Sequence, residues 1–145
     1  MNWFTPWNAK LFHQGKLVNL SIVKSIRKNR QFKQFKENGK RYNKRFFSLV
    51  VVKNNDYGKT SPIQSGIGLA VITSKKIGNA VKRNKIRRWI KEYFRKSKNR
   101  IPFNIDYLVI TKPGIFEYGY ENIIRDLENA IEKIREIYPP SGIYL

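Results

Sequence analysis

The sequence predicts a single α+β domain in the order α-β-β-α-β-α, a sandwich with a small mixed central sheet and a basic crossover helix. Three observations support this fold class. Two segments rich in β-branched and aromatic residues precede a long basic segment with helical spacing, a third such segment follows it, and an amphipathic segment comes last. With 145 residues, 41% of them hydrophobic and 14% aromatic, the chain can bury one modest core.

The N-terminal part is predicted to contain an extension and the first helix. Residues 1–20 show little periodicity, and we expect them to form an N-terminal extension or mobile tail. A helix is predicted over residues 29–38, because Asn29 can cap its start and Asn38-Gly39 tolerates the left-handed backbone that ends many helices.

Two strands are predicted next, at residues 45–53 and 67–73. Both segments are dominated by aromatic, β-branched and other apolar side chains, which favour extended structure. The polar run between them, residues 54–66, contains Gly58 and Pro62 and is a predicted loop.

The remaining elements are two helices on either side of a strand. The basic helix is predicted from about residue 79 to residue 98, the third strand over residues 105–111, and the last helix over residues 118–138, where apolar residues recur on one stripe. Pro139-Pro140 ends that helix, so we expect a folded domain over residues 21–138 and a short C-terminal tail over residues 139–145.

The charge is strongly positive and concentrated in the middle of the chain. Thirty Lys and Arg against ten Asp and Glu give a formal net charge of +20. Residues 22–100 contain 24 of these basic residues and only three acids, whereas the rest of the chain has six basic and seven acidic residues. A surface of this kind favours a polyanionic partner, with nucleic acid the first candidate and an anionic membrane surface the second.

Several other classes of site are excluded by composition. The chain has no cysteine, and His13 is its only histidine, so disulfides, thiolate metal sites and sites that need two imidazoles are ruled out. No stretch approaches the ~18 apolar residues of a membrane span, and the N-terminus does not resemble a signal peptide. We therefore expect a cytoplasmic protein.

The predicted basic helix has two distinct faces when it is plotted at ~100° per residue. Ile86, Trp89, Ile90, Tyr93 and Phe94 fall within one arc, which should face the sheet. The other side is almost purely cationic, with Arg83 at its border. This cationic arc consists of Asn84, Arg87, Arg88, Lys91 and Arg95. Cations at this spacing repel one another, and phosphates would relieve that cost.

The run that opens the helix resembles the signature of the bacterial ribonuclease P protein subunit. Lys75 and Lys76, followed by Ile77-Gly78-Asn79-Ala80-Val81-Lys82-Arg83-Asn84-Lys85-Ile86-Arg87-Arg88, follow that family's pattern almost throughout. Two features depart from the family: Lys85 stands where the Arg-Asn-Arg core has its second arginine, and residues 71–73 make the preceding strand about two residues longer. The resemblance covers about residues 21–137.

The resemblance implies an RNA-dependent function. In that family a catalytic RNA, with magnesium ions at its own active site, removes the 5′ leader of precursor tRNA, and the protein holds the RNA and the leader. No membrane partner and no obligate protein partner are expected. The RNA contacts implied for this chain are Lys75, Lys76, Arg83, Asn84, Lys85, Arg87, Arg88, Lys91 and Arg95.

The resemblance also implies a leader-binding cleft between the first helix and the sheet. Aromatic side chains beside lysines are a sequence-tolerant way to hold a single strand. Phe46 and Phe47 must point to opposite faces of their strand, so at least one of them is expected in the core. The residues that match or adjoin the family's cleft are Phe32, Phe35, Lys36, Phe47, Ser48 and Val50.

No catalytic or metal-binding constellation is evident in the protein itself. Six of the ten acids lie between residues 117 and 136, most of them on the expected outer face of the last helix and away from the basic helix. A structural RNA-binding protein, such as a ribosomal protein, is the main alternative, and a membrane-surface protein is the third. The Lys75-to-Arg88 signature favours the ribonuclease P hypothesis.

Overall fold

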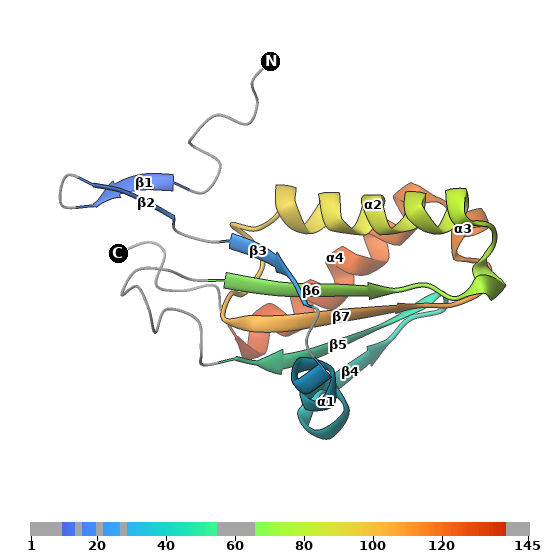
Figure 1. Ribbon diagram of the computed structural model, residues 1–145, viewed down its shortest axis with the longest axis horizontal. Helices are drawn as coiled ribbons and strands as arrows, with labels where there is room; N and C mark the ends of the chain where they lie inside the picture. Colours follow the sequence, from blue (N-terminus) through green and yellow to red (C-terminus); the bar gives the residue numbers. More distant parts are fainter. Residues whose placement is uncertain (1–9, 14–15, 20–21, 27–28, 55–65, 139–145) are drawn as a thin grey trace, which may run out of the picture.

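The computed structural model describes residues 10–13, 16–19, 22–26, 29–54 and 66–138 (Figure 1). Most of the predicted loop at residues 54–66, part of the N-terminal extension and the C-terminal tail lie outside the described residues. Among the described residues, no helix is long and apolar enough to cross a membrane.

A mixed sheet forms the centre of the fold, as predicted from the sequence, but it has five strands where three were expected. The strand order is β3-β6-β7-β5-β4. Three strands run parallel, and β5 and β4 continue the sheet in antiparallel fashion. The strands are β3 (Ile22–Ser25), β4 (Lys40–Asn43), β5 (Phe47–Lys53), β6 (Gly66–Ile72) and β7 (Ile105–Thr111).

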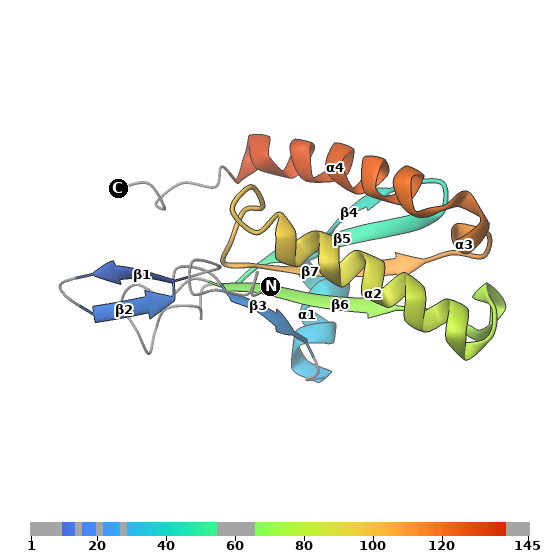
Figure 2. The ribbon, with the colours of Figure 1, turned by 90° about the horizontal axis from the view of Figure 1, so that it is seen from above.

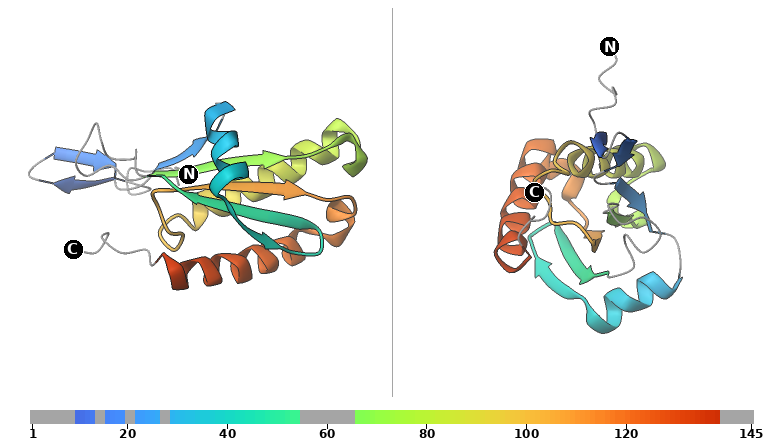
Figure 3. Two further views of the ribbon diagram at one scale, coloured as in Figure 1. Left: turned by 90° about the horizontal axis from the view of Figure 1, so that it is seen from below. Right: turned by 90° about the vertical axis from the view of Figure 1, so that its left-hand side faces the viewer.

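Helices cover both faces of this sheet (Figures 2 and 3). Helices α2 (Ala80–Lys96) and α4 (Tyr120–Ile137) lie on one face, and α1 (Asn29–Asn38) lies on the other. Helix α2 is the crossover between the adjacent parallel strands β6 and β7. The predicted bounds of α1 and β7 are confirmed residue for residue.

Five short elements were not predicted from the sequence. β3 and β4 add the two edges of the sheet, β1 (Lys10–His13) and β2 (Lys16–Asn19) form a separate antiparallel hairpin within the predicted extension, and α3 (Ile115–Tyr118) precedes α4. Each has only four residues, too few for a periodic pattern to be decisive. The predicted start of the last helix at residue 118 was early, because Gly119, at φ 95°, separates α3 from α4.

Two apolar clusters lie on opposite faces of the sheet because strand side chains alternate. On β5, Phe47, Leu49 and Val51 pack into the larger cluster with α2 and α4. Val50 and Val52 pack into the smaller cluster with Phe35 of α1. The second face therefore carries a thinner apolar layer under a single short helix.

Candidate nucleic-acid interface

A tight turn positions the start of α2. Lys75–Ile77 form one turn of 3₁₀-helix (η1), and the following Gly78 has φ 152°, a conformation that favours glycine. Asn79 then caps α2, its Oδ1 accepting a hydrogen bond from the backbone N–H of Lys82 at 3.0 Å. The Lys75 and Lys76 side chains are exposed on this turn. The turn thus places two cations at the helix N-terminus, whose unpaired N–H groups also favour anions.

The apolar side of α2 faces the sheet as the helical plot predicted. Ile86, Ile90 and Phe94 are wholly buried, and Tyr93 is nearly so. Trp89 is partly buried and packs against the edge of the same cluster. Burial of this stripe fixes the rotation of α2 about its axis, so the cationic arc lies on the side of the helix that is not buried in the larger cluster, with Lys91 and Arg95 toward the edge strand β3.

The cationic arc is a continuous outward-facing surface. Arg88, Lys91, Arg95 and Asn84 are exposed, and Arg87 is half-buried. Asn84 Oδ1 accepts a hydrogen bond from Arg87 Nη1 at 3.0 Å, which orients that guanidinium along the helix. The structure therefore brings together all five residues of the arc.

Arg83 and Lys85 occupy the two flanks of the arc. Arg83 is half-buried, and its Nε is a buried donor with no hydrogen-bond partner among the described residues. An unsatisfied donor of this kind is costly unless a ligand supplies the acceptor. Lys85 is exposed, but its ammonium lies 5.8 Å from the centroid of the Trp89 ring, on the flank that faces α3 and away from the arc. Lys85 thus lies at the edge of the arc, with its ammonium directed toward Trp89.

Burial and a neighbouring cation lower the pKa of one lysine just after the end of α2. The pKa of Lys98 lies below its ordinary value, because burial penalises the charged form and Arg95 repels it. Arg95 itself donates from Nη1 to both carboxylate oxygens of Glu92, at 2.9 and 3.2 Å. Glu92, the single acid of α2, is thus engaged with one cation, and seven further Lys or Arg residues of the helix remain uncompensated by it.

The face beside α1 holds most of the predicted cleft residues. Phe35 and Val50 are buried in the smaller cluster, Phe32 is half-buried against it, and Lys36 is exposed on α1. Ser48 is buried and donates a hydrogen bond to Asn43 Oδ1 at 2.6 Å.

Phe47 does not lie with these residues. It is wholly buried in the larger cluster on the opposite face of the sheet, because it is one residue out of phase with Ser48 and Val50. Phe46, just before β5, is half-buried and packs on Tyr118, with ring centroids 4.6 Å apart. The aromatic floor inferred from β5 is therefore absent from the α1 side.

Two isoleucines that the sequence analysis did not single out occupy that side instead. Ile72 is 42% exposed, and Ile110 is partly buried against the smaller cluster. Strand register aligns Ile72 with Ile110, Ile110 with Ser48, and Ser48 with Asn43. Together with Phe32 these residues form the α1-side surface, an open apolar row with polar groups at one end. The alternation of β6 and β7 could have identified it once their pairing was known.

No metal site is apparent in the part of the chain that the structure describes. It contains no group of three or more His, Asp or Glu side chains close enough to hold a metal ion. The described acids instead form local pairs, such as Glu128 with Arg100 at 2.9 Å and Glu117 with Lys82 at 3.6 Å.

These features define a class: a small basic α+β protein that presents one helix face of nearly uniform positive charge to a polyanion. Comparison with known proteins names the family. The family model described as Ribonuclease P matches residues 20–135. The chain belongs to the ribonuclease P protein family.

Individual relatives agree with this assignment. A ribonuclease P protein component from Syntrophus aciditrophicus is 35% identical over 119 residues, which cover 81% of this chain and 92% of the relative. The ribonuclease P protein of Staphylococcus aureus has a structure that matches with a TM-score of 0.62 at 30% identity, over 79% of this chain and 96% of that one. The protein from Thermotoga maritima gives a TM-score of 0.63 at 27% identity, over 76% and 96%.

Proposed function

We propose that this chain is the protein component of ribonuclease P and acts with a catalytic RNA to remove the 5′ leader of precursor tRNA. The main observation in support of the proposal is the cationic arc of α2. The arc begins within the Lys75-to-Arg88 signature, and its side chains lie outside the apolar core. Membership in the family supplies the reaction, the endonucleolytic maturation of tRNA.

The cationic arc is the proposed contact with the catalytic RNA. Arg87, Arg88 and Lys91 project from successive positions of one helix face and can each neutralise a phosphate. Arg83, whose Nε has no acceptor in the described part of the chain, extends this contact toward the N-terminus of α2, as do Lys75 and Lys76 on the turn. Counterion release then makes the affinity strongly dependent on salt.

The α1-side surface is the proposed site for the leader. Ile72 and Ile110 offer an exposed apolar floor for unpaired bases, Phe32 offers a ring edge, and Lys36 can neutralise a phosphate. Phe35 and Val50 support this surface from within the smaller cluster, whereas Phe47 lies on the opposite face of the sheet and has no part in it. This assignment replaces the β5 aromatic of the sequence-based hypothesis with two aliphatic side chains from β6 and β7.

Cleavage chemistry is assigned to the RNA in this proposal, with magnesium ions bound at the RNA active site. The distribution of acids supports that division, because Glu121, Asp126, Glu128, Glu132 and Glu136 all lie on α4, remote from the cationic arc in sequence and largely engaged with neighbouring cations. The protein then contributes affinity and position, and we expect it to act in the cytoplasm without an obligate protein partner.

Reconstitution tests the proposal directly. The purified chain is added to a ribonuclease P RNA at a magnesium concentration too low for the RNA alone to cleave precursor tRNA efficiently. We expect cleavage at the 5′ end of the mature tRNA to increase. If the chain bound the RNA without any gain in cleavage, the alternative of a purely structural RNA-binding protein would be favoured.

A further inference from the structure

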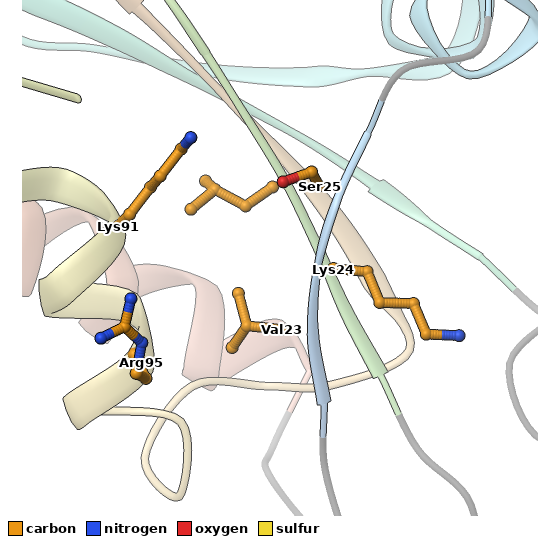
Figure 4. Close-up of a pocket in the computed structure, with 6 residues that line it drawn as sticks. Val23, Lys24, Ser25, Lys91 and Arg95 are labelled. Carbon is orange, nitrogen blue, oxygen red and sulfur yellow. The ribbon is translucent and has the colours of Figure 1, made fainter. Parts of the chain in front are cut away.

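A cleft lies between the edge strand β3 and the C-terminal half of α2 (Figure 4). It is lined by Val23, Lys24, Ser25, Leu69, Lys91 and Arg95. The side chains of Val23 and Ser25 point toward α2, whereas that of Lys24 extends away from the helix. We call this feature the β3–α2 cleft. It lies on the same side of the sheet as the cationic arc and opposite the α1-side surface.

The chemistry of the cleft is that of an anion site with an apolar base. Leu69 is buried and Val23 partly buried, so they form a floor that offers no hydrogen bond to water. Lys91 and Arg95 rise from α2 on one side, and the Ser25 hydroxyl faces them from β3. The cleft has a volume of about 130 Å³, the space of roughly four water molecules at ~30 Å³ each. That is enough space for a phosphate group.

Of the two α2 cations that line the cleft, Arg95 is paired with Glu92, whereas Lys91 has no acidic partner among the described residues. Lys91 and Arg95 stand one helical turn apart, a spacing at which like charges destabilise a helix. Among the described residues, Glu92 accepts hydrogen bonds from one Arg95 nitrogen, Nη1, while a guanidinium carries five N–H donors. Lys98 adds a further cation nearby, and its lowered pKa reports the repulsion from Arg95 in addition to the larger effect of burial. An anion seated in the cleft would relieve this repulsion.

We infer that the β3–α2 cleft binds one phosphodiester of an RNA strand, held by Lys91 and Arg95 from α2 and by the Ser25 hydroxyl from β3. This inference rests on the proposed function and adds a subsite to it. The edge strand β3, which the sequence analysis did not predict, becomes part of the RNA interface. The strand bound on α2 must then continue past the helix toward the β3 edge of the sheet.

A carboxylate placed at residue 25 tests the inference, because it would occupy the phosphate position. Ser25 is exposed on an edge strand, so Ser25→Glu should fold. Binding of the full chain to a ribonuclease P RNA is measured over a series of salt concentrations. We expect Ser25→Glu to weaken binding about tenfold and to reduce the slope of log affinity against log salt by about 0.9, the value of one phosphate. Ser25→Gln introduces a neutral side chain of the same size as glutamate, so this variant should retain most of the affinity and of the salt slope.

Matched variants separate this subsite from the wider interface. Asn129→Glu adds the same charge on the exposed side of α4 and should leave the slope unchanged. The inference is overturned if Ser25→Glu binds like the unmodified chain, or if Ser25→Gln loses as much affinity as Ser25→Glu. If Ser25→Glu binds normally and the double variant Arg87→Ala with Arg88→Ala also binds normally, both the subsite and the proposed function are contradicted. If the double variant binds weakly, only the subsite is contradicted.

A cross-linking experiment gives an independent answer and identifies the RNA. The chain has no cysteine, so Ser25→Cys provides one attachment point for a photoactivatable cross-linker. In the assembled complex with precursor tRNA, we expect a cross-link to RNA from residue 25 and none from the control Asn129→Cys. Labelling each RNA in turn shows whether the phosphate belongs to the catalytic RNA or to the precursor tRNA. Absence of a cross-link from residue 25 to either RNA would contradict the inference.

Discussion

Helices α2 and α4 lie on the same face of the sheet and have nearly the same length, 17 and 18 residues. Each buries one apolar stripe in the larger cluster: Ile86, Ile90 and Phe94 on α2, and Ile123 and Leu127, with three further residues, on α4. Their contributions to the core are therefore of the same kind. Nothing in the buried sides of the two helices distinguishes a structural helix from an interface.

The outward sides differ sharply. Helix α2 has eight Lys or Arg against one Glu, whereas α4 has three against five acids. The charges of α4 are largely satisfied within the protein, for example Asp126 by Tyr118 at 2.7 Å and Glu128 by Arg100 at 2.9 Å. Among the described residues, two cations of α2 have an acidic partner, Arg95 with Glu92 and Lys82 with Glu117. Burial of the apolar stripes thus determines where each helix packs, and the excess positive charge of α2 favours a polyanionic partner.

The largest effect is expected where the two helices are alike. Ile90→Ala on α2 and Leu127→Ala on α4 each remove a wholly buried side chain, so each should lower the free energy of unfolding by about 3 kcal/mol. Urea denaturation monitored by circular dichroism measures both values. A loss below about 1 kcal/mol for one of them would show that the two stripes do not contribute equally to the core.

A second prediction concerns the side on which the helices differ. Arg87→Ala combined with Arg88→Ala should weaken RNA binding about 100-fold, through the loss of two charge-assisted contacts of ~1.5 kcal/mol each. The salt slope should fall by up to about two phosphate equivalents. Arg125→Ala combined with Lys133→Ala removes the same charge from α4 and should alter binding little. Equal losses from the two double variants would indicate that total charge, and not the arc of α2, governs binding.

Helices α2 and α4 also show which parts of the structure could be predicted from the sequence. The amphipathic stripes of α2 and α4 and the apolar run of β7 are long enough for periodicity to place them, and the outer charge of α2 follows once its stripe is known. The signature around Gly78 adds the position of the turn. These features depend on local spacing alone.

Features that depend on strand pairing could not be predicted in this way. The assignment of Phe47 to the leader cleft failed because nothing local says which face of β5 meets α1. The α1-side surface and the β3–α2 cleft each combine residues from elements far apart in the chain, such as Ser25 with Lys91, and the four residues of β3 carry no strong pattern. Register and sheet order are non-local properties, and single-sequence spacing does not determine them.

The cap of α2 provides a third, smaller prediction. Asn79 accepts the hydrogen bond from the Lys82 N–H, whereas Gly119 before α4 provides no side-chain cap. Asn79→Ala should therefore cost about 1 kcal/mol of stability, and Asn79→Ser, which keeps a capping oxygen, should cost much less. Thermal unfolding measures both. A loss from Asn79→Ser as large as that from Asn79→Ala would mean that the residue acts through something other than capping.

The smallest expected effect lies at the junction of the two helices, where Glu128 of α4 accepts hydrogen bonds from the Tyr93 hydroxyl of α2 and from Arg100. Burial alone would raise the pKa of Glu128, but these two hydrogen bonds and the nearby positive charges outweigh it, and the pKa lies below its ordinary value of 4.5. A carboxyl whose pKa is lowered by folding stabilises the fold when the pH is above its pKa in the unfolded chain. That contribution disappears as the pH falls through its pKa in the folded protein.

The stability difference between the unmodified chain and Glu128→Gln should therefore be present at pH 7 and shrink on acidification below about pH 4.5. Because the Glu128 side chain is 31% exposed, the difference at pH 7 should not exceed about 1 kcal/mol. Tyr93→Phe, which removes the buried donor, should reduce the pH dependence. Urea unfolding at pH 7, 5 and 3 measures this, with Glu136→Gln on the exposed side of α4 as the control. A stability difference that stayed constant from pH 7 to pH 3 would show that the ionised carboxylate of Glu128 does not stabilise the contact between α2 and α4.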